Sequence, residues 1–321
     1  MARIHFNEVV TRDGFQNEPT FIPTDTKVEL VDELAACGYA KIEVTSFTSA
    51  KAIPMLSDAD TLMARLHRVP GVVYTVLVPN RRGAERALVA GADELNLVMS
   101  ASETHNLANL RMPRTESFAA LAQVIAMVDG KASINVSLSC CFGCPIEGEV
   151  PSSTVISLAQ RFADLGAGGI TICDTTGMAH PTQVGRLVEA LQGRLLSSHS
   201  ELQLTLHFHN TRGMGLANLL AAVHAGIRRF DGSLGGLGGC PYAPGASGNI
   251  CSEDAIHMLE AEGYDTGIDL ERLLRIARRL PEIVGHALPG QLAKAGRCND
   301  LHAPPAHVDE VRRRWQATPG R

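Results

Sequence analysis

The sequence lacks the features that mark exported, membrane-spanning or nucleic-acid-binding proteins. No apolar run approaches the roughly 20 residues that a membrane-spanning helix needs. Residues 4–10 already follow the pattern of a strand, so we expect no signal peptide. The net charge is −5 and no long basic run is present, which argues against a general nucleic-acid binder. We therefore expect a cytoplasmic protein with neither a membrane nor a nucleic acid as its partner.

Cysteine is present, but not in the arrangement of a disulfide framework or a metal cluster. The eight cysteines are scattered along the chain, and without export features they are expected to be reduced thiols. Cys140, Cys141 and Cys144 are closely spaced, but a structural zinc or iron–sulfur site would need a second such group. We expect these three to be structural thiols or to line a substrate site.

What the sequence does contain is an end-to-end alternation of strand-like and helix-like segments. A chain of 321 residues has room for two average domains or one large α/β barrel. Eight strand–helix units predict a (β/α)₈ TIM barrel at residues 1–290, with extra C-terminal helices and a helix or tail at 291–321. The predicted strands are residues 4–10, 41–45, 72–78, 94–99, 133–139, 169–173, 202–208 and 229–233. The predicted helices are residues 24–37, 58–68, 82–90, 116–129, 152–165, 181–191, 215–225 and 253–262.

Polar side chains gather at the C-terminal ends of the predicted strands, where the active sites of TIM barrels lie. A chance scatter of polar residues would not sort to one end, so this pattern supports both the fold and the site. By contrast, Asp129, Asp164 and Asp231 are expected on the solvated surface. The residues that follow the pattern are Arg12, Asp13, Glu43, Asn80, Cys140, Asp174, His207 and His209.

His207 and His209 are a histidine pair on the seventh predicted strand. Side chains at i and i+2 of a strand point the same way, so both imidazoles can reach one metal ion or simply pack and hydrogen-bond. Asp13 and the Asn249 amide complete a mixed nitrogen and oxygen ligand set. Such ligands suit Mg²⁺ or Mn²⁺, with Zn²⁺ or Co²⁺ as alternatives.

Residues Gly235–Asn249 predict a glycine-rich loop at the barrel mouth. The loop lacks the G-K-[ST] ending of a P-loop, so we reject a nucleotide-binding interpretation. Cys240 has an ordinary pKa of about 8.5, and a nearby cation would lower it towards neutral and make the thiol a general acid or base. Arg12 is either an ordinary ion-pair partner of Asp13 or a permanent charge for an enolate or carboxylate oxygen.

These motifs resemble those of the hydroxymethylglutaryl-CoA lyase family, metal-dependent barrel lyases related to isopropylmalate and homocitrate synthases. The resemblance covers nearly the whole chain and is most specific in the glycine-rich loop. The matching segments are Arg12–Glu18, Ile42–Phe47, Ser139–Gly148, Asp174–Gly177, His207–His209 and Gly235–Asn249.

The resemblance implies a metal-assisted retro-Claisen cleavage of a 3-hydroxyacyl-CoA that carries a carboxylate, such as hydroxymethylglutaryl-CoA, into acetyl-CoA and a keto acid. It implies that Arg12 stabilises the enolate, that Cys240 transfers a proton, and that Glu43 and Asp174 order the site. The implied metal ligands are Asp13, His207, His209 and Asn249, and the implied substrate-binding residues are Gln16, Ser139, Asn210 and Arg212. The expected partners are an acyl-CoA substrate and further copies of the chain, as a dimer or larger homo-oligomer.

The chain departs from the family pattern at six positions. Asn210 and Arg212 stand where the family usually has Asp and Tyr, and Pro19 stands where it usually has Lys. One interpretation is drift on loops. The other is a changed substrate of malyl type or with a branch, in which Arg212 adds positive charge for another or differently placed carboxylate. The remaining departures are His105, Ala108 and Arg111, in place of an aromatic residue, Lys and Asn.

Two further functions share parts of this pattern. A condensing synthase would use the same Arg-Asp and His-x-His residues, but such enzymes usually carry a C-terminal regulatory domain, which residues 291–321 are too short to form. A ligand-binding barrel without catalysis would have no reason to retain Arg12, Cys240 and the four proposed metal ligands. A lyase is therefore the expected function.

Overall fold

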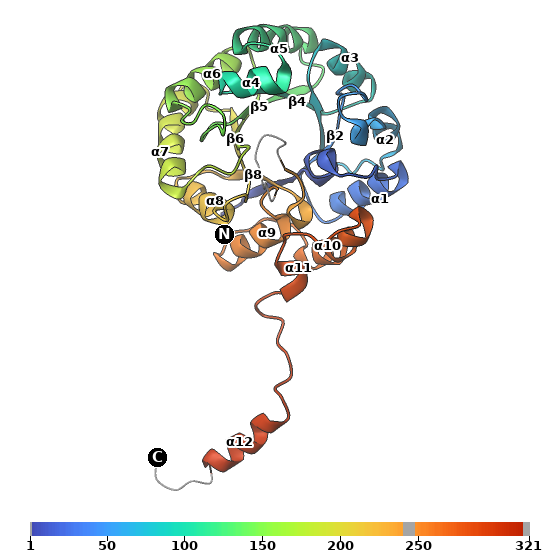
Figure 1. The fold of residues 1–321 in the computed structure, drawn as a ribbon, viewed down its shortest axis with the longest axis vertical. Coiled ribbons are helices and arrows are strands. Elements are labelled where there is room, and N and C mark those ends of the chain that lie inside the picture. Colours follow the sequence, from blue (N-terminus) through green and yellow to red (C-terminus); the bar gives the residue numbers. More distant parts are fainter. Residues whose placement is uncertain (1, 240–247, 317–321) are drawn as a thin grey trace.

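The structure is a computed structural model that describes residues 2–239 and 248–316. Eight parallel strands close into one barrel in chain order, and helices surround it as a ring (Figure 1). The predicted TIM barrel is therefore confirmed. The strands are β1 His5–Glu8, β2 Lys41–Ser46, β3 Val73–Val78, β4 Glu94–Ser100, β5 Ser133–Ser139, β6 Gly169–Asp174, β7 Gln203–Phe208 and β8 Arg229–Gly232. The helices are α1 Thr24–Ala35, α2 Ala59–Arg65, α3 Arg81–Val89, α4 Glu103–Leu110, α5 Arg114–Val128, α6 Ser152–Asp164, α7 Pro181–Leu191, α8 Gly215–His224, α9 Ser252–Ala261, α10 Leu270–Val284, α11 Leu292–Ala295 and α12 His307–Gln316.

Two elements differ from the sequence expectation. The first strand ends at Glu8, because the chain then enters a π-helical turn, Val10–Gly14. Helix α4 was not predicted, and it places His105 and Ala108 on a helix rather than on a loop. The Ser102 side chain caps this helix by accepting a hydrogen bond from the His105 backbone N–H at 3.1 Å.

The interior of the barrel contains many buried polar side chains. On β4, Leu95 and Leu97 belong to the apolar core, whereas Glu94 and Asn96 bond to residues of β2. Because successive side chains of a strand point to opposite faces, Glu94 and Asn96 lie on the face opposite Leu95 and Leu97, which is the barrel interior. The strands therefore direct apolar side chains towards the helices and polar ones inwards, with the period of two that strands impose.

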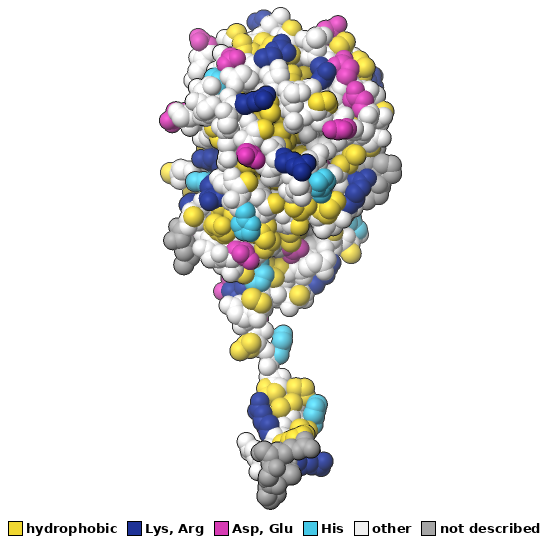
Figure 2. Space-filling model, turned by 90° about the vertical axis from the view of Figure 1, so that its left-hand side faces the viewer, with side chains coloured by type: hydrophobic (Ala, Val, Ile, Leu, Met, Phe, Trp, Pro, Cys, Tyr) yellow, Lys and Arg dark blue, Asp and Glu magenta, His cyan; other side chains and the backbone are white. Residues whose placement is uncertain are grey.

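The C-terminal segment leaves the barrel after α11. Helix α12 stands away from the body of the protein at the end of an extended segment, and its described side chains are not buried (Figures 1 and 2). No helix among residues 2–239 and 248–316 is both long enough and apolar enough to cross a bilayer.

Glu8 is a fully buried carboxylate that joins the first and last units of the barrel. It accepts hydrogen bonds from the backbone N–H groups of Val10 and Leu234, each at 2.9 Å, and from the Ser252 hydroxyl at 2.8 Å. Burial is the dominant cause that raises the pKa of Glu8 to about 7 from 4.5, against the opposing effect of these donors. This carboxylate therefore couples folding to pH.

We expect the wild-type protein to lose stability as the pH rises from about 4.5 to about 7. The folded protein holds the Glu8 proton more tightly than the unfolded chain, so the stabilisation is complete below the unfolded pKa and is lost through the folded pKa. The loss is on the order of 3 kcal/mol. Urea unfolding at several pH values should show that the free energy of unfolding depends less on pH in Glu8→Gln than in wild type. The same pH dependence in both proteins would refute the assignment to Glu8.

Candidate active site

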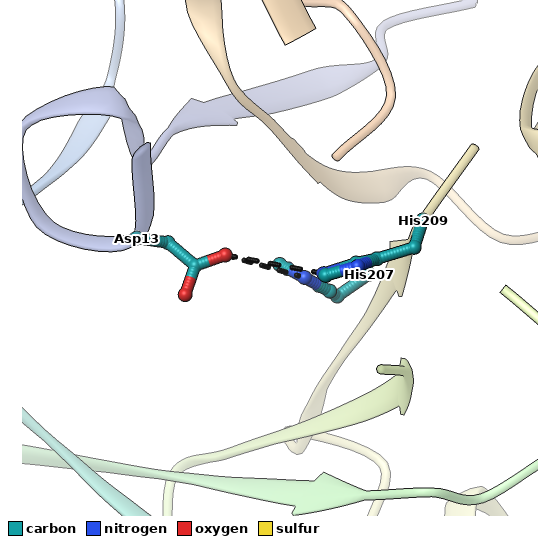
Figure 3. A group of neighbouring side chains, drawn as sticks. All are labelled: Asp13, His207 and His209. Atoms are coloured by element: carbon teal, nitrogen blue, oxygen red, sulfur yellow. Dashed lines mark ion pairs between the residues drawn. The ribbon is translucent and has the colours of Figure 1, made fainter. Parts of the chain in front are cut away.

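Asp13, His207 and His209 converge at the C-terminal end of the barrel (Figure 3). Asp13 lies in the turn after β1. His207 lies on β7, and His209 is the first residue after that strand. The Asp13 Oδ2 atom lies 4.0 Å from His207 Nε2 and 3.9 Å from His209 Nε2. One potential ligand atom from each side chain lies within 4.8 Å of the other two. All three residues are buried, and the structure brings together these three of the four residues that the sequence predicts as metal ligands.

Asn249 joins this group from the far end of the glycine-rich loop. Its Nδ2 donates to Asp13 Oδ2 at 2.8 Å and to the Leu237 carbonyl at 2.9 Å. Its Oδ1 is buried and has no hydrogen-bond partner among the described residues. Gly238, with φ of +115°, lets the loop backbone pass close to Asp13 and Asn249. A Cβ at this position would lie 2.4 Å from Asn249 Nδ2.

The two histidines have opposite pKa shifts. Burial, reinforced by the nearby His207, lowers the pKa of His209 to about 3, so this imidazole is neutral at pH 7. Burial also disfavours a charged His207, but the hydrogen bond and charge of Asp231, together with Asp13, outweigh it and raise the pKa of His207. The site therefore holds one neutral imidazole and one that is oriented by a carboxylate.

Asp231 is a residue beside the site that the sequence pattern placed wrongly. It was expected on the solvated surface, yet its side chain is only 14% exposed and its Oδ2 lies 3.4 Å from His207 Nδ1. The strand register pairs Asp231 directly with His207. Asn7 donates to the other carboxylate oxygen at 2.8 Å. The signal was its position at the centre of a short predicted strand, where one side chain in two points into the barrel.

Arg12 lies between two carboxylates at the edge of the same site. Its Nη1 bonds Asp13 Oδ1, and its Nε donates to Glu43 Oε2 at 2.6 Å. Burial disfavours the guanidinium charge, but Asp13 and Glu43 outweigh that effect and raise the pKa of Arg12. The same charge, with the two histidines, lowers the pKa of Asp13 to about 2 in spite of its burial. Arg12 and Asp13 are therefore both ionised at neutral pH.

Asp174 ends β6, next to the strand that carries His207. Its Oδ1 accepts hydrogen bonds from the backbone N–H groups of Met178 at 2.7 Å and Ala179 at 3.1 Å. Its Oδ2 is buried without a hydrogen-bond partner in the described part of the chain. Burial is the main cause that raises the pKa of Asp174 to about 6. A carboxylate with this pKa and one open oxygen can exchange a proton near neutral pH.

The predicted substrate-binding residues occupy different positions. Ser139 ends β5 and is buried, whereas Gln16 is half-buried in the turn after Asp13. Asn210 Oδ1 accepts from the Gly215 N–H at 3.0 Å and so holds the start of α8. Arg212 is exposed, and its Nη1 donates to the carbonyls of Thr176 and Gly177, each at 2.9 Å. Their contacts with a substrate stay predictions.

Cys240 lies outside the described residues, so its predicted role in proton transfer stays a prediction. The described ends of its loop are held firmly to the barrel. The Asn17 amide donates to the Gly239 carbonyl at 2.9 Å, and the Asn210 N–H donates to the Gly248 carbonyl at 3.0 Å. The loop therefore begins and ends beside the residues of the site.

The donor set fits a divalent cation. Asn249 Oδ1 is a buried acceptor without a donor among the described residues, and such an acceptor costs stability unless a cation or a donor binds it. The neutral His209 and the ionised Asp13 are in the protonation states that metal ligands require. A mixed set with two imidazoles, a carboxylate and an amide oxygen suits Mg²⁺, Mn²⁺ or a later transition metal.

We expect Asp231→Asn to weaken binding of Mn²⁺ by about 10- to 100-fold, the usual cost of losing a partner of a metal-bound histidine. An amide has a single acceptor oxygen, so it cannot serve both Asn7 and His207. Isothermal titration with Mn²⁺ measures the effect. Asp129→Asn is the matched control because this residue is exposed and has the left-handed backbone conformation that asparagine tolerates. Equal affinities for the two variants would contradict the role of Asp231.

The sequence of this chain is similar to those of known lyases. The family model described as HMGL-like matches residues 3–280 of the chain. The chain belongs to this family. It is 44% identical to a hydroxymethylglutaryl-CoA lyase of Bacillus subtilis, over 90% of this chain and 96% of that protein. It is 39% identical to an (R)-citramalyl-CoA lyase of Chloroflexus aurantiacus, over 92% of this chain and 96% of that protein.

A solved structure of this family supports the same conclusion. An HMG-CoA lyase from Acinetobacter baumannii, in complex with coenzyme A and 3-methylmalate, superposes with a TM-score of 0.90. It is 50% identical to this chain and the match covers 94% of this chain and 98% of that one. The resemblance inferred from the sequence is therefore confirmed, and this member of the HMGL-like family is a carbon–carbon lyase.

Proposed function

We propose that the chain cleaves hydroxymethylglutaryl-CoA to acetyl-CoA and acetoacetate. One observation supports this proposal: the candidate cation ligands and the Arg12–Asp13 ion pair lie together at the C-terminal end of the barrel. Asp13 belongs to both, because it bonds Asn249 on one side and Arg12 on the other. Relatives named as hydroxymethylglutaryl-CoA lyases, over nearly their whole length, support the choice of substrate.

In this reaction a base takes the proton of the 3-hydroxyl group. The electron pair of the C2–C3 bond then moves to the thioester side and forms the enolate of acetyl-CoA, while C3 becomes the ketone of acetoacetate. Protonation of the enolate carbon releases acetyl-CoA. Asp174, with a pKa near 6 and an open Oδ2, is suited to hold the hydroxyl proton. Cys240 is the proposed donor to the enolate.

Arg12 supplies positive charge where the enolate oxygen becomes negative. Its guanidinium is held on one side by Asp13 and on the other by Glu43, so it needs little reorganisation during the reaction. Asp13, His207, His209 and Asn249 would hold the divalent cation. When bound, that ion would act as a Lewis acid and a template for the hydroxyl and carboxylate of the substrate.

A second substrate class is favoured by Arg212. This residue stands where the family usually has Tyr, and only its Nη1 bonds to residues in the described part of the chain. Its other N–H groups can bind a carboxylate, so a malyl-type or branched 3-hydroxyacyl-CoA is the alternative. A relative named as an (R)-citramalyl-CoA lyase shows that the family includes such an activity.

A panel of thioesters decides between these substrates. Hydroxymethylglutaryl-CoA, citramalyl-CoA and malyl-CoA are each incubated with enzyme and Mg²⁺ or Mn²⁺, and the products are identified by mass spectrometry. We expect the highest kcat/KM for hydroxymethylglutaryl-CoA. Cleavage of none of the three would reject the lyase function, and preference for citramalyl-CoA would establish the alternative.

The remaining predictions belong to the same proposal. A condensing synthase would consume acetyl-CoA and a keto acid and would release free CoA, so incubation with those two reactants tests that function. We also propose that the lyase works as a cytoplasmic homo-oligomer, with residues 1–290 as its catalytic domain and residues 291–321 as a helical tail. Sedimentation of the full chain measures the oligomeric state.

A further inference from the structure

Asn96 is the centre of a belt of buried polar side chains inside the barrel. Its Nδ2 donates to Glu43 Oε1 at 2.7 Å. Its Oδ1 accepts from Asn135 Nδ2 and from the Ser137 hydroxyl, each at 2.9 Å. These four side chains come from β2, β4 and β5, and all are buried. The amide of Asn96 is therefore oriented by two donors on one side and donates on the other.

Asn135, a partner of Asn96, is itself held in place by the next strand. Asn135 donates a second hydrogen bond, to the Thr171 hydroxyl at 3.0 Å on β6. Gly169, at the start of the same strand, leaves room for Asn135, because a Cβ there would lie 2.6 Å from Asn135 Oδ1. The belt thus runs from β2 to β6, and the strand register sets Asn96 beside Asn135 on the neighbouring strand.

The two oxygens of Glu43 have different partners. Oε1 accepts from Asn96, and Oε2 accepts from Arg12 Nε at 2.6 Å. Burial raises the pKa of Glu43, whereas the charge of Arg12 and the hydrogen bond from Asn96 lower it and partly offset the burial. Both partners therefore favour the ionised carboxylate, and together they fix the plane in which it faces the guanidinium.

We propose that Asn96 is a positioning residue for the lyase reaction, acting on Arg12 through Glu43. It directs the Glu43 carboxylate, which in turn holds the guanidinium towards the reacting thioester. The Asn96 amide suits this position because it accepts from Asn135 and Ser137 through its oxygen and donates to Glu43 through its nitrogen at every pH. This role rests on the proposed function, in which Arg12 faces the enolate.

Two variants of Asn96 test the proposal with the substrate that the thioester panel identifies. We expect Asn96→Ala to lower kcat by about 10- to 100-fold, the cost of one hydrogen bond to a charged group, with KM changed less than about threefold. The affinity for Mn²⁺ should stay within about twofold, since Asn96 touches none of the proposed ligands. Values of kcat within twofold of wild type for both Asn96→Ala and Asn96→Asp would overturn the proposal.

Asn96→Asp carries a signature that a purely structural role would not produce. The charged groups that face this position are Glu43 and, through it, Arg12; Glu94 lies two residues earlier on β4 and is paired with Lys41 at 2.7 Å. A protonated Asp donates to Glu43 as the amide did, whereas an ionised Asp repels it. The ratio of the Asn96→Asp kcat to the wild-type kcat should therefore fall as the pH rises from 6 to 8. A ratio that is low but independent of pH would also overturn the proposal.

Thr75→Val is the matched control for the Asn96 variants, because it also removes a buried hydrogen-bonding group from the barrel interior. Thr75 is paired with Glu43 in the strand register, but its hydroxyl donates to Glu94 at 3.0 Å rather than to Glu43. This variant should keep the wild-type kcat and pH profile.

Urea unfolding separates this proposal from the proposed function. The proton shared by the Asn96→Asp side chain and Glu43 is held more tightly in the folded state than in the unfolded chain. The urea midpoint of Asn96→Asp, relative to that of wild type, should therefore decrease as the pH rises from 5 to 8. If the wild-type enzyme cleaves no thioester, this shift still shows that Asn96 and Glu43 are coupled. A midpoint difference that is constant with pH would overturn the coupling.

Discussion

Replacing Asp13 with asparagine is expected to lower kcat by about 10³-fold or more, because a catalytic cation contributes several kcal/mol to the transition state. The Asp13 carboxylate faces both histidines and also bonds Asn249. Its pKa near 2 keeps it ionised at neutral pH. An amide at this position would offer a neutral oxygen to the cation, so Mn²⁺ binding measured by titration calorimetry should be lost along with turnover.

The fold should survive this substitution. Arg12 keeps its second carboxylate partner, Glu43, so no guanidinium is left buried without a counter-charge. Circular dichroism should therefore show an unchanged barrel, and Asp129→Asn serves as the control with an exposed carboxylate. An Asp13→Asn enzyme that binds Mn²⁺ within a few-fold of wild type would show that the cation site lies elsewhere.

Replacing Arg12 with lysine is expected to lower kcat by about 10²- to 10³-fold, as for the loss of one preorganised group that stabilises an oxyanion. The charge is retained, but an ammonium cannot bond Asp13 and Glu43 through separate nitrogens of a planar fork. The charge would then be free to leave the position that the two carboxylates define. Steady-state kinetics should show the loss in kcat rather than in KM.

The affinity for Mn²⁺ shows whether Arg12 acts on the substrate or on the metal ligands. Arg12→Lys should bind Mn²⁺ nearly as well as wild type, because Arg12 contacts the carboxylate oxygen of Asp13 that does not face the histidines. Arg161→Lys, on the exposed side of α6, is the matched control and should keep full activity. A loss of Mn²⁺ binding equal to the loss in kcat would assign Arg12 to the metal site instead.

Much of the candidate site could be predicted because strands place residues two apart on one face and barrels collect strand ends in one place. His207 and His209 followed from the first rule, and their meeting with Asp13 from the second. Asp231 and helix α4 were missed for different reasons. An aspartate in a four-residue strand looks like a surface charge unless the inner face of the strand is known. The buried residues of helix α4 are the polar His105 and Asn106, so the helix shows no apolar period in the sequence.

The sequence alone determined the barrel, the strand-end residues and the family, because each depends on order along the chain or on spacing within one strand. Only the tertiary structure decided two pairs of side chains that meet across strands: the Asp231 carboxylate with His207, and the Asn96 amide with Glu43. Local patterns carry no record of these pairs, because the contacts join residues far apart in the chain. Closure and register of the barrel create them.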